Sequence, residues 1–197
     1  MSTKAADQDT EKLIKETAMK VFFTEGRFNA TTQEIADAAG VNRTLINYYF
    51  RSRDKLFEQV FDDAHRHEHE LTEQIVFSNL PFKEKISRHL DTFFEQAKKY
   101  PYLEIYMVTQ VNQGCVFKDQ DQMSNLLKKF YKEIEEEMEK GNIEKMRPEQ
   151  FALNFISLMS FPVSMRPLLQ ETMGFSKEEF DTLLEERKEI IMKTLFK

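Results

Sequence analysis

The chain has few residues that interrupt or cross-link a fold. Its 197 residues include five glycines, five prolines and one cysteine, Cys115. A single cysteine excludes an internal disulfide framework. The shortage of glycine and proline, together with 31% charged residues, favours long helices. There is no run of about 18 apolar residues that would span a membrane, and no basic-then-apolar leader opens the chain. We therefore expect a cytoplasmic protein without a membrane partner.

Two short helices joined by a tight turn are predicted between Thr31 and Phe50. Thr31 and Glu34 have the spacing of a capping box, in which each side chain accepts a hydrogen bond from the other residue's backbone N–H. Gly40 stands where the first helix must end, because glycine adopts the left-handed conformation at little steric cost. The segment predicts a helix-turn-helix. The alternative is an ordinary helical hairpin with a solvated polar face.

The second helix of this segment has an apolar side and a polar side. At about 100° per residue, Ile46, Tyr49 and Phe50 share the side that anchors the helix. The opposite side is short and polar, which suits a helix whose N-terminal part enters the major groove of DNA. Asn47 has the chemistry to pair with adenine, and Arg43 with guanine or phosphate. The predicted DNA-binding residues are Thr31, Thr32, Asn42, Arg43, Thr44, Asn47, Tyr48, Tyr49 and Arg53.

Residues on both sides of the helix-turn-helix extend the pattern. Upstream, Gly26 is preceded by an apolar face that consists of Ile14, Ala18, Phe22 and Phe23. Downstream, residues 48–56 read Tyr-Tyr-Phe-Arg-Ser-Arg-Asp-Lys-Leu, which resembles the ending Tyr-His-Phe-x-Ser-Lys-x-x-Leu of one family. Over residues 12–60 the chain is similar to the TetR family of transcriptional regulators.

The resemblance has implications for the whole chain. It implies an all-α fold with an N-terminal three-helix helix-turn-helix DNA-binding domain, residues 1–56, and a C-terminal helical effector-binding and dimerisation domain, residues 57–197. It also implies a regulator rather than an enzyme, without a cofactor. Such a protein is expected to be a dimeric repressor that binds a palindromic operator in double-stranded DNA and is released by a small hydrophobic effector.

At five positions the chain departs from the residues common in that family: Thr44, Leu45, Asn47, Tyr49 and Arg53. Members often carry Gly and Thr at the first two positions, Tyr at the third, His at the fourth and Lys at the fifth. These changes leave the predicted fold intact. We expect Leu45 and Asn47 to read bases that a more typical member does not read.

Charge is distributed unevenly between the two predicted domains. Residues 1–56 hold nine Lys or Arg and eight Asp or Glu, whereas residues 57–197 hold 19 and 26. The net charge of −6 therefore arises in the C-terminal domain. Because the N-terminal domain is only weakly basic, DNA binding is expected to depend on a few placed cations, namely Arg43, Arg51, Arg53 and Lys55. Helix N-termini add partial positive charge.

Further helices are predicted to fill the rest of the chain. The first is expected over residues 10–25 after a polar, disordered segment of residues 1–9, and later ones over 53–77, 82–99, a short segment ending near 113–114, and 119–140. The helix predicted over residues 148–173 is apolar on all sides, so it must be buried on all sides. Pro162 and Pro167 are expected to bend or interrupt it. A second capping box, Ser176 and Glu179, begins the final helix.

The last two helices are predicted to form a homodimer. One side of an apolar helix can be covered by the domain's own core and the other by a second copy of the chain. Paired recognition helices would then address two half-sites about one turn of DNA apart. The alternative is that these two helices form the core of a monomer.

An effector pocket is implied by the resemblance and has indirect support in the sequence. Aromatic residues and flexible methionines can line an adaptable apolar cavity. The predicted ligand-binding residues are Phe93, Tyr102, Tyr106, Met107, Phe130, Phe155 and Met159. The same residues could equally make a close-packed core.

A histidine-rich run offers a competing interpretation. His65 and His69 share a helix face, with Glu68 beside them and His67 nearby. Two histidines and a carboxylate are an incomplete metal site without a ligand from elsewhere. A solvated helix face is the favoured interpretation of the run, so no metal site is predicted. A metal-binding helical protein and a protein-interaction scaffold remain alternatives to the DNA-binding regulator. No nucleophile with a base, phosphate-binding loop or di-iron motif supports an enzyme.

Overall fold

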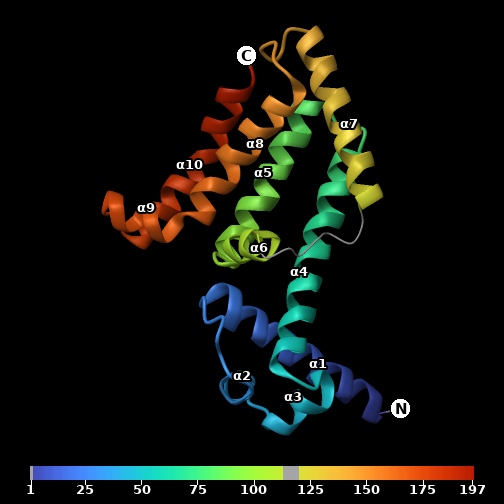
Figure 1. The fold of residues 1–197 in the computed structure, drawn as a ribbon, viewed down its shortest axis with the longest axis vertical. Helices are drawn as coiled ribbons and strands as arrows, with labels where there is room; N and C mark the ends of the chain where they lie inside the picture. Colours follow the sequence, from blue (N-terminus) through green and yellow to red (C-terminus); the bar gives the residue numbers. More distant parts are fainter. Residues whose placement is uncertain (1, 113–119) are drawn as a thin grey trace. The chain divides into compact units, whose positions relative to one another are not determined.

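The computed structural model describes residues 2–112 and 120–197, and within these ranges every regular element is a helix (Figure 1). The predicted all-α fold is confirmed. Cys115 and the predicted helix end at residues 113–114 lie outside the described residues. The helices are α1 (Ser2–Met19), the π-helical turn η1 (Lys20–Thr24), α2 (Thr32–Ala39), α3 (Arg43–Phe50), α4 (Arg53–Val76), α5 (Phe82–Lys99), α6 (Leu103–Asn112), α7 (Gln120–Glu139), α8 (Pro148–Ser164), α9 (Arg166–Met173) and α10 (Lys177–Leu195).

Two predictions about helix boundaries are wrong. Residues 2–9 were expected to be disordered, but they form the beginning of α1. The single helix predicted over residues 148–173 is two helices, α8 and α9, with Met165 between them at φ −99° and ψ 12°. Pro167 explains the break, because its ring lacks an N–H and clashes with the carbonyl group four residues earlier. Pro162 is tolerated inside α8.

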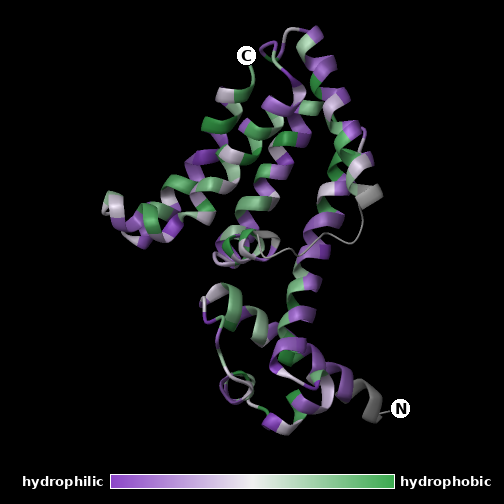
Figure 2. Ribbon diagram, viewed as in Figure 1, coloured by the Kyte–Doolittle hydropathy of each residue, from purple (hydrophilic) through white to green (hydrophobic). Residues whose placement is uncertain are grey.

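The chain folds into two compact units. The first contains the residues up to Glu70 together with Tyr100–Leu103, and the second contains Leu71–Lys99 and the described residues from Glu104 onward. Helix α4, 24 residues long, begins in the first unit and ends in the second. Hydrophilic residues line its middle (Figure 2). The sequence analysis divides the chain at residue 56 into a DNA-binding domain and an effector-binding domain. That boundary separates two functions, whereas the two units are defined by packing, so the functional boundary stays a prediction.

Aromatic residues at the end of α1 and the beginning of α4 form the core of the first unit. The rings of Phe22 and Phe57 are 4.6 Å apart, and the guanidinium of Arg53 lies 5.2 Å and 5.0 Å from their centres. Ile35 of α2 and Ile46 of α3 are completely buried in this unit. With Ala36 and Phe50, each of the two helices of the helix-turn-helix thus contributes two buried residues to this core.

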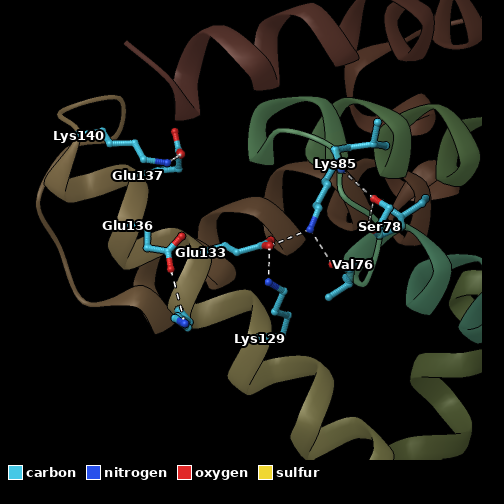
Figure 3. Close-up of polar contacts among 11 residues, drawn as sticks. Val76, Ser78, Lys85, Lys129, Glu133, Glu136, Glu137 and Lys140 are labelled. Atoms are coloured by element: carbon cyan, nitrogen blue, oxygen red, sulfur yellow. Dashed lines mark hydrogen bonds and ion pairs between the residues drawn. The ribbon is translucent and has the colours of Figure 1, made fainter.

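The core of the second unit is built by α5, α7, α8 and α10. Its buried cluster includes Leu90, Ile134, Phe151 and Ile191, one from each of these helices. Lys85 of α5 is also buried. Figure 3 shows its ammonium group between the carbonyl oxygen of Val76, at the end of α4, and the carboxylate of Glu133 on α7, at 2.7 Å from each. A buried cation thus fastens the end of α4 to this unit.

Candidate DNA-binding site

The beginning of α2 is fixed by the capping box that the sequence predicts. The backbone N–H of Thr31 donates to the Glu34 carboxylate at 2.8 Å, and the backbone N–H of Glu34 donates to the Thr31 hydroxyl at 3.3 Å. Hydrogen bonds that the Thr31 backbone N–H and hydroxyl donate to the Glu34 carboxylate, both at 2.8 Å, and the bond from Arg27 at 2.5 Å lower the pKa of the Glu34 carboxyl. Gly40 ends α2 at φ 66°. The local geometry of the helix-turn-helix therefore agrees with the sequence pattern, including its left-handed turn.

Helix α3 presents a short polar face to solvent. Its N-cap is Asn42, whose side-chain oxygen accepts hydrogen bonds from the backbone N–H of Thr44 at 2.9 Å and from its hydroxyl at 2.8 Å. Ile46 and Phe50 are buried, and the side chains on the opposite side are exposed, up to 70% for Tyr48. The exposed face joins Arg43, Thr44, Asn47 and Tyr48, with Asn42 at its end.

Tyr49 and Arg53, two of the predicted DNA-binding residues, are bonded to distant segments of the chain. Tyr49 is half-buried and its hydroxyl donates a hydrogen bond to the Asp7 carboxylate, which raises the pKa of Tyr49 to about 12. Arg53 donates to the carbonyl oxygen of Ala30 at 3.3 Å and pairs with Asp54 at 3.0 Å. Thr31 and Thr32 lie at the start of α2, where Thr32 is half-buried. Contact of all nine residues with DNA stays a prediction.

A strained backbone at Arg51 is a feature that the sequence pattern missed. Arg51 has φ 65° and ψ −37°, and the N–H of Ser52 donates to the carbonyl oxygen of Phe50 at 2.8 Å. This is close to a classic γ-turn, a rare and strained conformation. Among the described residues Arg51 alone combines a side chain with positive φ. Strain of this kind recurs at functional sites, and here it directly follows the exposed helix.

The predicted ligand-binding residues fall into three places. Phe93, Phe155 and Met159 are buried in the core of the second unit, with Phe130 packed against them and its ring 6.2 Å from that of Phe155. Tyr106 and Met107 are half-buried on α6. Tyr102 belongs to the first unit, where its ring packs against Gly26 and lies edge-on to Phe28 at 6.3 Å.

The second unit has a hollow that is separate from the predicted ligand-binding residues. It has a volume of about 510 Å³ and lies between the beginning of α8 and the end of α10. Residues from both helices line it, including Phe151, Leu158 and Leu195. None of the predicted ligand-binding residues lines this hollow. Binding of an effector by those residues stays a prediction.

The histidine-rich run does not assemble a metal site in the part of the chain that the structure describes. Within it, no three His, Cys, Asp or Glu side chains are grouped in a way that could hold a metal ion. His65 is half-buried, and desolvation, with a smaller effect of His69, lowers its pKa.

No described helix is both long and apolar enough to cross a membrane.

Known proteins match this site. Residues 14–60, which include all of the helix-turn-helix, match the family model for bacterial regulatory proteins of the tetR family. This segment of the chain is a helix-turn-helix of the TetR type. The metal-binding and scaffold alternatives are not favoured, because the matched TetR segment is the segment that forms the exposed α3 face.

Two curated HTH-type transcriptional regulators share sequence beyond this segment. The chain is 30% identical over 93 residues to the uncharacterised HTH-type transcriptional regulator YhgD of Bacillus subtilis, and the match covers 47% of this chain and 48% of YhgD. It is 26% identical over 151 residues to the HTH-type regulator AcrR of Shigella flexneri, covering 74% and 70%. The match therefore spans about half the length of the first relative and more of the second.

Solved TetR-family structures share the fold. A regulator of the TetR/AcrR family from Thermobifida fusca superposes with a TM-score of 0.63 at 14% identity, covering 93% of this chain and 97% of that one. The fatty acid degradation regulator FadR of Bacillus halodurans superposes with a TM-score of 0.60 at 16% identity, covering 92% and 94%. The likeness covers nearly the whole of both proteins.

Proposed function

We propose that this TetR-family DNA-binding regulator is a homodimeric repressor, which binds a palindromic operator and is released by a small hydrophobic effector. The exposed face of α3 carries the proposal. Arg43, Thr44, Asn47 and Tyr48 project from a helix whose start is capped and whose opposite side is buried. This arrangement suits insertion of the N-terminal half of α3 into a major groove.

An exposed apolar face supports the dimer. Helices α8 and α10 pack against each other, and both expose large apolar residues, which Figure 2 colours green. Leu153 and Ile156 of α8 are 56% and 50% exposed, and Leu183 and Ile190 of α10 are 41% and 47% exposed. Exposed apolar side chains gathered on two neighbouring helices favour an association site, and a twofold dimer pairs one such surface with itself.

The core of the second unit supports a hydrophobic effector. Phe93, Phe130, Phe155 and Met159 provide aromatic and flexible side chains in one core. Such side chains adapt to varied hydrophobic molecules. Release would follow if the effector binds more tightly to a dimer whose recognition helices no longer match the half-sites.

Fluorescence anisotropy tests the operator. The purified protein is titrated into the DNA upstream of its own gene and into a scrambled duplex, at two salt concentrations. We expect tight, salt-sensitive binding to the first duplex. Asn47→Ala and Tyr48→Ala are each expected to weaken it by about 5- to 150-fold, the range for one lost base contact. Gln59→Ala, an exposed change on α4, is the control. Equal binding of wild type and both α3 variants would contradict the assignment.

Sedimentation velocity tests the dimer. Ile156→Glu together with Leu183→Glu places two charges on the apolar face, so we expect a monomer with weakened operator binding. Glu178→Lys, an exposed change at the start of α10, is expected to leave the dimer intact. A dimer that survives the double substitution would place the interface on other helices.

A further inference from the structure

A hydrogen bond joins the beginning of α1 to the recognition helix. The hydroxyl of Tyr49 on α3 donates to the carboxylate of Asp7 on α1, which lies 42 residues earlier in the chain. The side chain of Thr10, about one turn further along α1, also hydrogen-bonds Tyr49. The end of α3 is therefore held from outside the helix-turn-helix itself.

The ring of Tyr49 connects this hydrogen bond to the proposed DNA-binding face. The Tyr48 and Tyr49 rings meet edge to face, with centres 5.0 Å apart and an angle of 78° between their planes. The Tyr49 ring also lies 6.1 Å from the ring of Phe50, which is buried. Tyr49 is thus restrained at its hydroxyl by Asp7 and along its ring by two neighbours.

We propose that Asp7 is a positioning residue of the DNA-binding site, which orders Tyr48 for contact with DNA by fixing the ring of Tyr49. This inference rests on the proposed function of α3. Tyr48 is 70% exposed and so has freedom to lose when it meets DNA. A side chain that is already ordered in the free protein loses less rotamer freedom on binding.

Asp7 could also affect DNA binding through its negative charge alone, and this effect can be distinguished from the positioning of Tyr48. A carboxylate close to a DNA-binding face repels phosphates, so its removal raises affinity for any duplex. Loss of the Tyr49 hydrogen bond, in contrast, lowers the affinity only where Tyr48 makes an ordered contact. The ratio of operator affinity to scrambled-duplex affinity therefore falls if Asp7 positions Tyr48, and stays constant if Asp7 acts by charge alone.

The test compares five variants by anisotropy on the two duplexes. Asp7→Ala and Tyr49→Phe each remove the hydrogen bond, and we expect each to lower the affinity ratio by roughly two- to tenfold, which corresponds to the ordering of one side chain. The double variant is expected to fall no further, since both changes break the same contact. Asp9→Ala removes a charge from an exposed position of α1 and is the matched control. Asp7→Asn keeps an acceptor and should preserve most of the ratio.

The contact itself has an independent readout. In a spectrophotometric titration, the signal that Tyr49→Phe abolishes should shift toward an ordinary tyrosine pKa in the Asp7→Ala variant. Equal affinity ratios for Asp7→Ala and Asp9→Ala, or additive effects in the double variant, would overturn the positioning role. If instead the wild-type protein binds the two duplexes equally, the proposed function is contradicted. The positioning role of Asp7, which depends on that function, is then contradicted as well, independently of the results for the variants.

Discussion

The ring of Tyr102 lies directly against Gly26. A Cβ atom at residue 26 would be 3.0 Å from two carbons of that ring, and the backbone N–H of Tyr102 donates to the carbonyl oxygen of Phe23 at 3.1 Å. Phe23 belongs to the π-helical turn at the end of α1. The segment of residues 100–103 is thereby a part of the first unit, although the helices it connects, α5 and α6, belong almost entirely to the second.

This contact predicts different costs for two glycine substitutions. Gly26 and Gly40 have φ values of 70° and 66°, so Ala at either position costs about 1–2 kcal/mol of backbone strain. Gly40 has no atom within 4 Å of an added Cβ, whereas Gly26 faces Tyr102. We expect Gly26→Ala to destabilise the protein by about 1 kcal/mol more than Gly40→Ala in urea denaturation. In a Tyr102→Ala background the two costs should converge; a persistent difference would assign it to another neighbour.

Removing the charge of Lys85 alone is expected to lower the free energy of unfolding more than removing the charges of Lys85 and Glu133 together. Lys85→Met leaves the buried Glu133 carboxylate with Lys129, at 2.9 Å, as its cation and leaves the Val76 carbonyl without its ammonium donor. We expect a loss of about 3 kcal/mol in the free energy of unfolding. The double variant Lys85→Met and Glu133→Leu should cost less, because no buried charge remains. Asp91→Asn, in an exposed pair with Lys188, is the control, with a change below about 0.5 kcal/mol. A Lys85→Met protein as stable as wild type would show that the buried Lys85 contacts do not stabilise the second unit.

His89 predicts an acid-sensitive second unit. Burial lowers its pKa to about 4, and its ring packs 5.5 Å from that of Phe155. The unfolded chain binds a proton near pH 6.5 and the folded chain only near pH 4, so stability is complete above pH 6.5 and falls as the pH drops toward 4. The full loss is at most about 3 kcal/mol. His89→Gln should flatten this part of the stability profile, whereas His67→Gln, at an exposed histidine, should leave it unchanged.

Arg51 predicts a trade between stability and DNA affinity. Gly adopts positive φ without the steric cost that Arg51 pays, so Arg51→Gly should stabilise the protein by up to about 1 kcal/mol, net of the entropy that glycine adds to the unfolded chain. Arg51→Ala keeps the strain and serves as the control for the lost charge. Both variants should bind operator and scrambled duplexes more weakly and reduce the salt slope by about 1. A salt slope that does not change would remove Arg51 from the phosphate contacts.

The parts of this site that the sequence predicts depend on signals within one turn of helix. The Thr31–Glu34 capping box, Gly40 and the burial of Ile46 opposite Asn47 all follow from spacings of a few residues. Periodicity likewise indicates an apolar face on α10, although it does not tell which of its residues face the core.

The parts that it does not predict depend on distant contacts. Asp7 and Tyr49 are 42 residues apart, and Tyr102 meets Gly26 across 76 positions of sequence. The sequence does not indicate which residue an aromatic side chain packs against. It therefore predicts Tyr102 as a ligand-binding residue, although Tyr102 packs in the first unit. The sequence likewise does not predict the burial of Lys85, because a lysine four residues after Pro81 on an amphipathic helix is normally solvated.

The γ-turn at Arg51 leaves only Arg51 and Ser52 between α3 and α4. Ser52 also caps the next helix, since its hydroxyl accepts from the backbone N–H of Lys55 at 3.1 Å. Phe50 before the turn and Leu56 after it are both buried in the same unit. With only two residues in the connection and no proline or glycine from Arg53 to Val76, α3 is closely coupled to the first turn of α4. In the proposed mechanism, an effector that tilts this turn therefore tilts the exposed face of α3 with it, and all the proposed base contacts shift together.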